Sequence, residues 1–168
     1  TGTGDILFSQ SGGGALTVTL AQTTDGDIGI DVDGANLTAT TVTAGGAGQN
    51  VTLTTTTSGD ILVDNVTAAG DTITVNSVGA IEESGADAGA DLTAGTLDLD
   101  AATGIGVAGT IETAATTISA DTTNGDIDID NTNAAATTAT SLTTGTGDIL
   151  FSQSGGGALT VTLAQTTD

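Results

Sequence analysis

Copies of one tripeptide, Gly-Asp-Ile, recur along the chain, and their spacing limits the fold more than any other feature of the sequence. Full copies lie at residues 4–6, 26–28, 59–61, 125–127 and 147–149, with weaker ones at 79–81 and 104–105. Most copies follow the previous one by about 20–25 residues, whereas the step from Asp27 to Asp60 is 33 residues. Repeats of this length are typical of solenoids, in which each turn buries its apolar side only against its neighbours.

Alternation of apolar and polar residues follows each copy. Ile28, Ile30 and Val32 occupy every second position, as Ile127 and Ile129 do, and residues two apart share one side of a β-strand. No segment combines a 3.6-residue period with helix caps. The sequence therefore predicts an all-β chain folded as a parallel β-solenoid (β-helix) with about 20–22 residues per coil. The predicted core ladder consists of Ile6, Phe8, Ile28, Ile30, Ile61, Val63, Ile127 and Ile129.

Two segments depart from the regular pattern. The 33-residue step contains NVTLTTTT at residues 50–57, which we expect to add part of a coil. Residues 82–91, EESGADAGAD, lack the alternation and place Glu83 where an inward side chain is expected. We therefore predict that this segment leaves the coil.

A longer repeat surrounds the short one. Residues 1–25 are identical to residues 144–168, an offset of 143. The chain thus divides into one unit, residues 1–143, and the first coil of the next, identical unit, residues 144–168. We expect a window on a tandem array with six to seven coils per unit, which would rise by roughly 29–34 Å. The alternative is a 168-residue subunit whose two ends match.

The composition suits a thin, regular core. The chain has 26 Gly and two Phe, and it has no Trp, Tyr, Pro, Met or Cys. Disorder is one alternative because the net charge is −21, but the acids are scattered and Val, Ile and Thr favour strands. A string of β-sandwich modules is another alternative, although such modules usually contain a core aromatic residue.

The pattern T-x-G-D-I-x-I/V is clearest at residues 24–30 and 123–129. This pattern, with the Thr-rich alternation after it, resembles the repeat regions of large secreted bacterial exoproteins of the filamentous-haemagglutinin type. It is also similar to surface proteins described as "beta strand repeat". The resemblance implies a right-handed parallel β-helix, export from the cell, and a role as a long surface fibre or adhesin stalk.

The missing residue types exclude several functions. The chain contains no Lys, Arg, His, Cys or Tyr, so we expect no nucleic-acid partner, because phosphates need cations. We expect no membrane insertion, because no apolar run approaches the roughly 20 residues of a spanning helix. A serine nucleophile would lack its base, and paired carboxylates alone would lack the side chains that recognise a sugar. We therefore predict that the protein is not an enzyme and requires no cofactor.

Carboxylates are hard ligands that suit Ca²⁺, the one metal we consider. The candidate ligands are Asp25, Asp27, Asp31 and Asp33, which cluster in DGDIGIDVDG, and Asp126, Asp128 and Asp130. Stacked about 4.8 Å apart, like charges would repel by roughly 1–3 kcal/mol per pair, and a cation would relieve this. The structural alternative is that these Asp side chains bond nearby backbone in turns and discourage lateral aggregation.

The favoured function is structural: an extracellular fibre or stalk at the cell surface that associates with itself along its axis and side by side. The alternative is an adhesin-type binding module that holds Ca²⁺ or carbohydrate on its acidic face. Four Thr-x-Thr motifs, at residues 17–19, 38–40, 52–54 and 72–74, suggest a third candidate, an ice-binding face. Their irregular spacing of 21, 14 and 20 residues argues against a single array.

Overall fold

The computed structural model describes residues 2–85 and 87–167, and these residues form sixteen β-strands in parallel pairing. The strands are β1 (Ile6–Gln10), β2 (Leu16–Val18), β3 (Ala21–Gln22), β4 (Ile28–Asp33), β5 (Leu37–Thr43), β6 (Val51–Thr56), β7 (Ile61–Ser77), β8 (Ile81–Glu83), β9 (Leu92–Ala101), β10 (Ile111–Ala114), β11 (Thr117–Thr122), β12 (Ile127–Asn131), β13 (Thr137–Thr144), β14 (Ile149–Gln153), β15 (Leu159–Val161) and β16 (Ala164–Thr166). No described residue is in a helix, and accordingly no helix there could cross a membrane.

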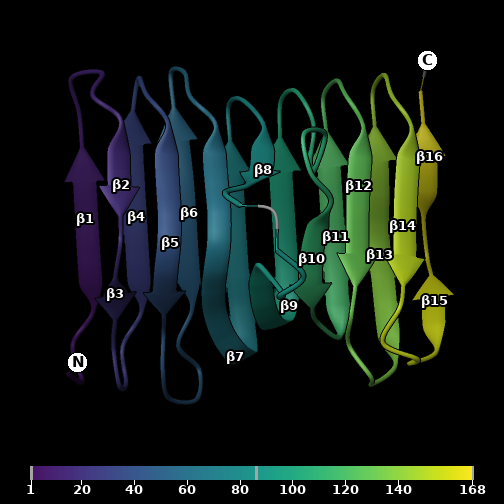
Figure 1. The fold of residues 1–168 in the computed structure, drawn as a ribbon, viewed down its shortest axis with the longest axis horizontal. Helices are drawn as coiled ribbons and strands as arrows, with labels where there is room; N and C mark the ends of the chain where they lie inside the picture. The colour runs from purple at the N-terminus through teal and green to yellow at the C-terminus, as the bar shows by residue number, and fades with distance from the viewer. Residues whose placement is uncertain (1, 86, 168) are drawn as a thin grey trace.

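The chain winds through two layers, which we name face A and face B (Figure 1). Face A contains β1, β4, β6, residues 72–77 of β7, residues 96–101 of β9, β11, β13, β15 and β16. Face B contains β2, β3, β5, residues 61–68 of β7, β8, residues 92–94 of β9, β10, β12 and β14. In Figure 1 the arrows of the two layers point in opposite directions. The prediction of an all-β parallel β-solenoid is confirmed, with about seven turns.

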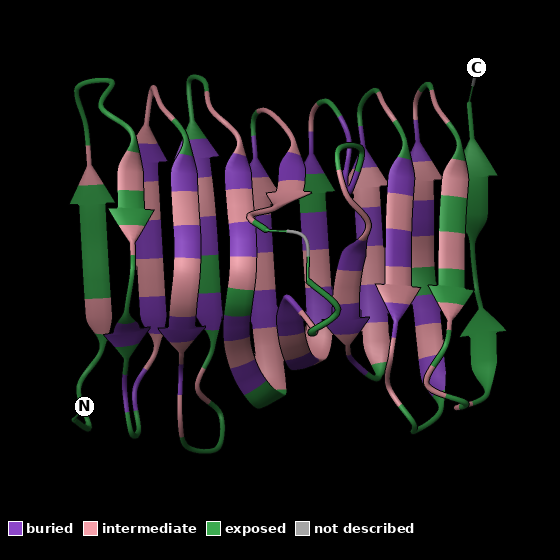
Figure 2. Ribbon diagram, in the orientation of Figure 1, coloured by how far each residue is buried: buried purple, intermediate pink, exposed green. Residues whose placement is uncertain are grey.

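Buried residues alternate with half-buried or exposed ones along most strands (Figure 2). Equivalent residues stack from turn to turn: Ile28, Val51, Ile73, Leu97 and Ile118 form one fully buried column on face A. Leu37, Ile61, Ile81, Ile105 and Ile127 form another on face B. Six of the eight predicted core residues are buried. Ile6 is half-buried and Phe8 is 49% exposed, because β1 is the first strand and has a neighbour on one side only.

The long step between Asp27 and Asp60 holds one and a half turns. Val51–Thr56 forms β6, which pairs with β4 on one side and β7 on the other, so residues 50–57 supply the extra part-coil predicted from the sequence. As a result, the Gly-Asp-Ile copies at residues 4–6 and 26–28 begin strands of face A, whereas the later copies begin strands of face B. The Thr-x-Thr motifs are divided in the same way, two on each face.

Glycine in the motif allows consecutive turns to approach closely at the corner. A Cβ on Gly59 would overlap the carbonyl oxygen of Ala35 in the preceding turn, and Gly59 has φ +120°. Gly125 stands in the same relation to Thr103, with φ +91°. Only glycine combines this conformation with such an approach.

Candidate functional site: an acidic cluster beneath two loops

Two neighbouring turns leave the regular coil on face B. Two residues separate Val63 from Val66 on this face. Their pairing partners in the next turn are Glu83 and Leu92, and eight residues separate these two. The sequence predicted an excursion over residues 82–91. Glu82 and Glu83 instead remain in β8 and pair with β7, and the chain leaves the coil at residues 84, 85 and 87–91, with Ala86 outside the described residues. In the following turn, residues 106–110 form a second loop, since Ile105 and Ile111 pair with Ile127 and Ile129.

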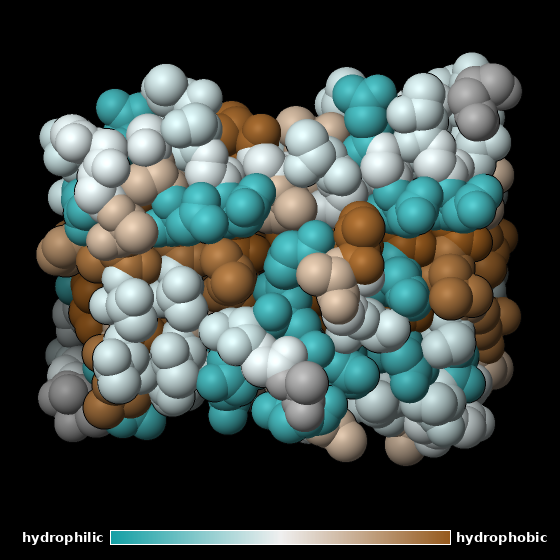
Figure 3. Space-filling model, turned by 45° about the horizontal axis from the view of Figure 1, so that its top comes forward, coloured by the Kyte–Doolittle hydropathy of each residue, from teal (hydrophilic) through white to brown (hydrophobic). Residues whose placement is uncertain are grey.

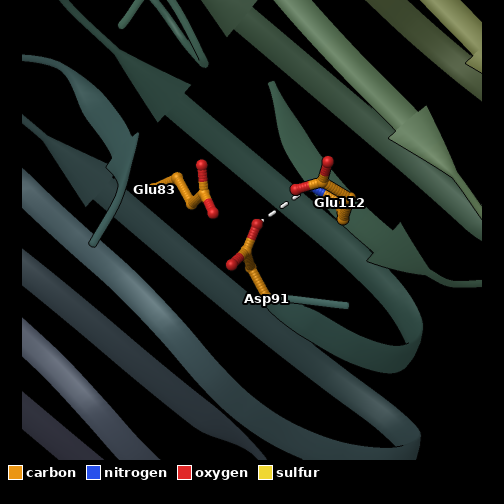
Figure 4. Close-up of side chains that lie close together, drawn as sticks. All are labelled: Glu83, Asp91 and Glu112. Atoms are coloured by element: carbon orange, nitrogen blue, oxygen red, sulfur yellow. Dashed lines mark hydrogen bonds between the residues drawn. The ribbon is translucent and has the colours of Figure 1, made fainter. Parts of the chain in front are cut away.

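Three carboxylates meet beneath these loops (Figure 4): Glu83 at the end of β8, Asp91 before β9 and Glu112 in β10. One carboxylate oxygen of each lies within 4.8 Å of the others. The backbone N–H of Glu112 donates to Asp91 Oδ2 at 2.9 Å, and the N–H of Asp91 donates to the carbonyl of Glu112 at 2.8 Å. The backbone pairing of adjacent turns therefore fixes Asp91 against Glu112.

Glu83 and the neighbouring Glu82 also hold the two loops in place through hydrogen bonds. Glu83 Oε1 accepts the N–H of Asp87 at 2.9 Å, and Glu82 Oε2 accepts the N–H of Ala108 at 2.8 Å. In Figure 3, the hydrophobic band along the molecule is interrupted near its middle by hydrophilic residues.

Burial dominates the electrostatics of the cluster. Asp91 is 1% exposed, and desolvation raises its pKa from a usual value near 3.8 to about 8, helped by the charges of Glu112, Glu83 and Asp87 and opposed by the hydrogen bond from Glu112 N–H. Desolvation, with the charge of Glu83, also raises the pKa of Glu112. Glu112 Oε2 is buried and has no hydrogen-bond partner. With a pKa of about 8, Asp91 is the group in the cluster that retains a proton at neutral pH.

The aspartates of the Gly-Asp-Ile motif have a different environment. Asp27 Oδ1 accepts the N–H of Asn50 one turn later at 2.7 Å, and the N–H of Asp27 donates to Asp5 Oδ1 at 3.0 Å. On face B, Asp126 Oδ1 accepts the N–H of Asp148 at 2.8 Å. These carboxylates therefore satisfy backbone donors of the next turn at the start of each strand, and charge-assisted hydrogen bonds of this kind are strong.

The other predicted calcium ligands lie on or beside β4 and β12. Asp33 accepts from Thr56 at 3.2 Å and Asp128 from Thr110 at 3.1 Å, both through side-chain hydroxyls. Asp130 accepts from Ser152 and Ser154 at 2.7 and 2.9 Å. Asp25 is exposed in the turn before β4, and Asp31 Oδ1 is buried without a hydrogen-bond partner.

The structure does not bring the seven predicted ligands together. Asp25, Asp27, Asp31 and Asp33 belong to face A, whereas Asp126, Asp128 and Asp130 belong to face B in a later turn. Within residues 2–85 and 87–167, the one trio of carboxylates close enough to share an ion is Glu83, Asp91 and Glu112.

Sequence reasoning singled out Glu83 as an acid at an inward position but missed its partners. Asp91 lies at the end of a Gly-rich acidic segment, and Glu112 lies in an ordinary alternating run. Their proximity depends on the lengths of two loops in adjacent turns, which the local pattern does not reveal.

The comparisons with known proteins give no family for this chain. No family model matches the sequence, no curated protein matches it, and no solved structure matches either.

Proposed function

We propose that this chain is a segment of an extracellular structural fibre or stalk at the cell surface, in which parallel β-solenoid turns stack continuously. The observation that carries the proposal is the parallel strand ladder, which runs through both faces from the first strand to the last. Solenoids whose turns contact only their neighbours extend in one dimension, and their terminal turns need a cover.

Two further observations support a continuous fibre. Both ends leave inward-facing apolar side chains in solvent: Phe8 is 49% exposed at one end, and Val161 is 47% exposed at the other. The strands at both ends are mostly exposed (Figure 2). Exposed apolar surface of this kind marks a contact site. The expected partners are therefore further turns of the same fibre, and fibres lying side by side. The role is mechanical, without catalysis or a required cofactor.

The native assembly tests this proposal. Native material is run on a strongly denaturing gel and probed with an antibody raised against the chain, and the same antibody carries gold for electron microscopy of intact cells. We expect a band far above the 15.9 kDa of this chain and gold along filaments at the cell surface. A band near 15.9 kDa, together with gold confined to the cell interior, would overturn the proposal.

A calcium-binding module of the adhesin type, with Ca²⁺ or carbohydrate on its acidic face, is the second candidate. The observation that favours it is the cluster of Glu83, Asp91 and Glu112, in which one buried carboxylate oxygen has no partner. Carboxylate oxygens are the ligands that Ca²⁺ prefers in proteins.

A calorimetric titration with CaCl₂ at pH 8.5 separates the two candidates. If the second is correct, binding saturates, and Glu112→Gln weakens it at least tenfold, whereas Asp126→Asn leaves it unchanged. If the ligands are instead the motif aspartates, the effects of these variants are reversed. Weak heats that vanish in 0.3 M NaCl would rule out a specific site and favour the fibre, since salt screens diffuse ion binding.

A further inference from the structure

Equivalent strands of the two identical 25-residue segments lie on opposite faces of the solenoid. Ile6–Gln10 of the first copy forms β1 on face A, whereas Ile149–Gln153 of the second forms β14 on face B. The later strands of each copy are exchanged in the same way: β2 and β3 belong to face B, and β15 and β16 to face A. In Figure 1 the arrows of β1 and β14 accordingly point in opposite directions.

The pairing gives the number of turns that separate the copies. From Ile6 on face A to Leu16 on face B the chain makes half a turn. Six one-turn steps then follow, from Leu16 through Leu37, Ile61, Ile81, Ile105 and Ile127 to Ile149. The 143-residue unit therefore contains six and a half turns of 22 residues on average.

Together, the two copies show how the same segment packs against the turn that follows it and the turn that precedes it. The first copy is covered on its following side, where Phe8 pairs with Ile30 and Val18 with Ala39. The second is covered on its preceding side, where the equivalent Phe151 pairs with Ile129 and Val161 with Ala139. Since the strands of both copies have the same bounds to within one residue, one conformation of the segment accepts a neighbour on each side.

We propose that consecutive 143-residue units join as one uninterrupted solenoid in which each unit is rotated by half a turn from the one before. The open apolar end formed by Ile6, Phe8, Leu16 and Val18 is then covered by residues equivalent to 119–143 of another unit, as β12 and β13 cover the second copy here. Phe8 becomes buried between an equivalent of Ile129 and Ile30. The inference concerns geometry and builds on the proposed fibre.

The half turn decides what the fibre displays. The two-loop projection over Glu83, Asp91 and Glu112 lies on face B here, so it emerges on the opposite side of the fibre in the next unit. Successive projections are about 31 Å apart along the axis, from six and a half turns at about 4.8 Å. Projections on the same side are about 62 Å apart, after thirteen turns. A partner that binds the projections on one side of the fibre therefore contacts only every second unit.

A chain with two and one with three units test the arrangement, each ending in residues 144–168. Ala88→Cys in every unit provides a unique exposed thiol in the loop, because the natural chain has no cysteine. A maleimide gold cluster marks each thiol, and single particles are imaged by cryo-electron microscopy. A two-unit chain that carries the substitution in only one unit shows which of the two labels belongs to which unit.

We expect a straight rod with labels on opposite sides, about 31 Å apart along the axis. In the three-unit chain, the first and third labels lie on one side, about 62 Å apart. Labels in a single row would overturn the half-turn arrangement. Two rods joined by a bend, or a chain that loses the β-sheet circular dichroism of the 168-residue protein, would overturn the continuous junction. These outcomes do not depend on whether native filaments are found, so they are distinct from failure of the proposed function.

Discussion

Gly59→Ala is expected to lower the free energy of unfolding by about 3–5 kcal/mol and the melting temperature by about 10 °C or more. The added Cβ would overlap the carbonyl of Ala35, which cannot move aside because it is backbone of the preceding turn. Asp60, the next residue, donates its N–H to Asn36 Oδ1 at 3.0 Å, so both sides of the contact are fixed. The positive φ of Gly59 adds strain for any other residue. Thermal and urea unfolding followed by circular dichroism measure the loss.

Gly4→Ala is the matched control, because it changes the same position of the same motif. No atom lies within 4 Å of the place its Cβ would take, since no turn precedes it in this structure. We expect its free energy of unfolding to stay within about 0.5 kcal/mol of the natural chain. Equal losses in the two variants would show that the motif glycine acts through chain flexibility rather than through contact between turns.

The strands and their stacking could be predicted because each follows from a local pattern in the sequence. Apolar residues two apart identified Ile28, Ile30, Ile127 and Ile129 as inward, and the repeat length identified the coil. The same pattern misleads after the weak copy at residues 104–105: Ile105 is buried, but Val107, two residues on, is 54% exposed in a loop. Gly106, with φ +71°, turns the chain out of the strand there.

The face on which each strand lies could not be predicted from the motif alone. The copies of Gly-Asp-Ile at Asp27 and Asp60 look equivalent in sequence, yet the half turn supplied by β6 puts them on opposite faces. The predicted calcium ligands were divided for the same reason. Since the two faces have similar alternation, only the long-range pairing distinguishes them.

The acidic cluster was still harder to predict. Asp91 and Glu112 meet because the chain leaves the coil in two successive turns, and each departure has its own length. The 22-residue repeat does not indicate that loops of different length occur in two successive turns. The burial of Asp91 is likewise a property of the loops that cover it rather than of its neighbours in sequence.

Asp91→Asn is expected to stabilise the protein at alkaline pH and to leave it unchanged near pH 4. The folded chain keeps a proton on Asp91 up to a pKa of about 8, whereas the unfolded chain releases it near 3.8. Stability from this proton is therefore complete below about pH 4 and is lost as the pH rises to about 8. The amide is neutral throughout and keeps an oxygen to accept the N–H of Glu112.

The full pKa difference sets an upper bound of about 6 kcal/mol, which solvent and relaxation of the loops reduce. We expect a gain of about 2 kcal/mol at pH 8.5, or about 4–8 °C in melting temperature.

Asp64→Asn separates this effect from the general repulsion of a chain with net charge −21. Asp64 is half-buried on the outer side of β7, outside the acidic cluster, so its substitution removes one charge and no buried carboxylate. We expect a change below about 0.5 kcal/mol at either pH. If both variants gain equally at pH 8.5, repulsion over the whole surface governs the pH dependence. If Asp91→Asn alone gains, the two loops enclose a carboxylate that the fold tolerates only with a proton or another cation beside it.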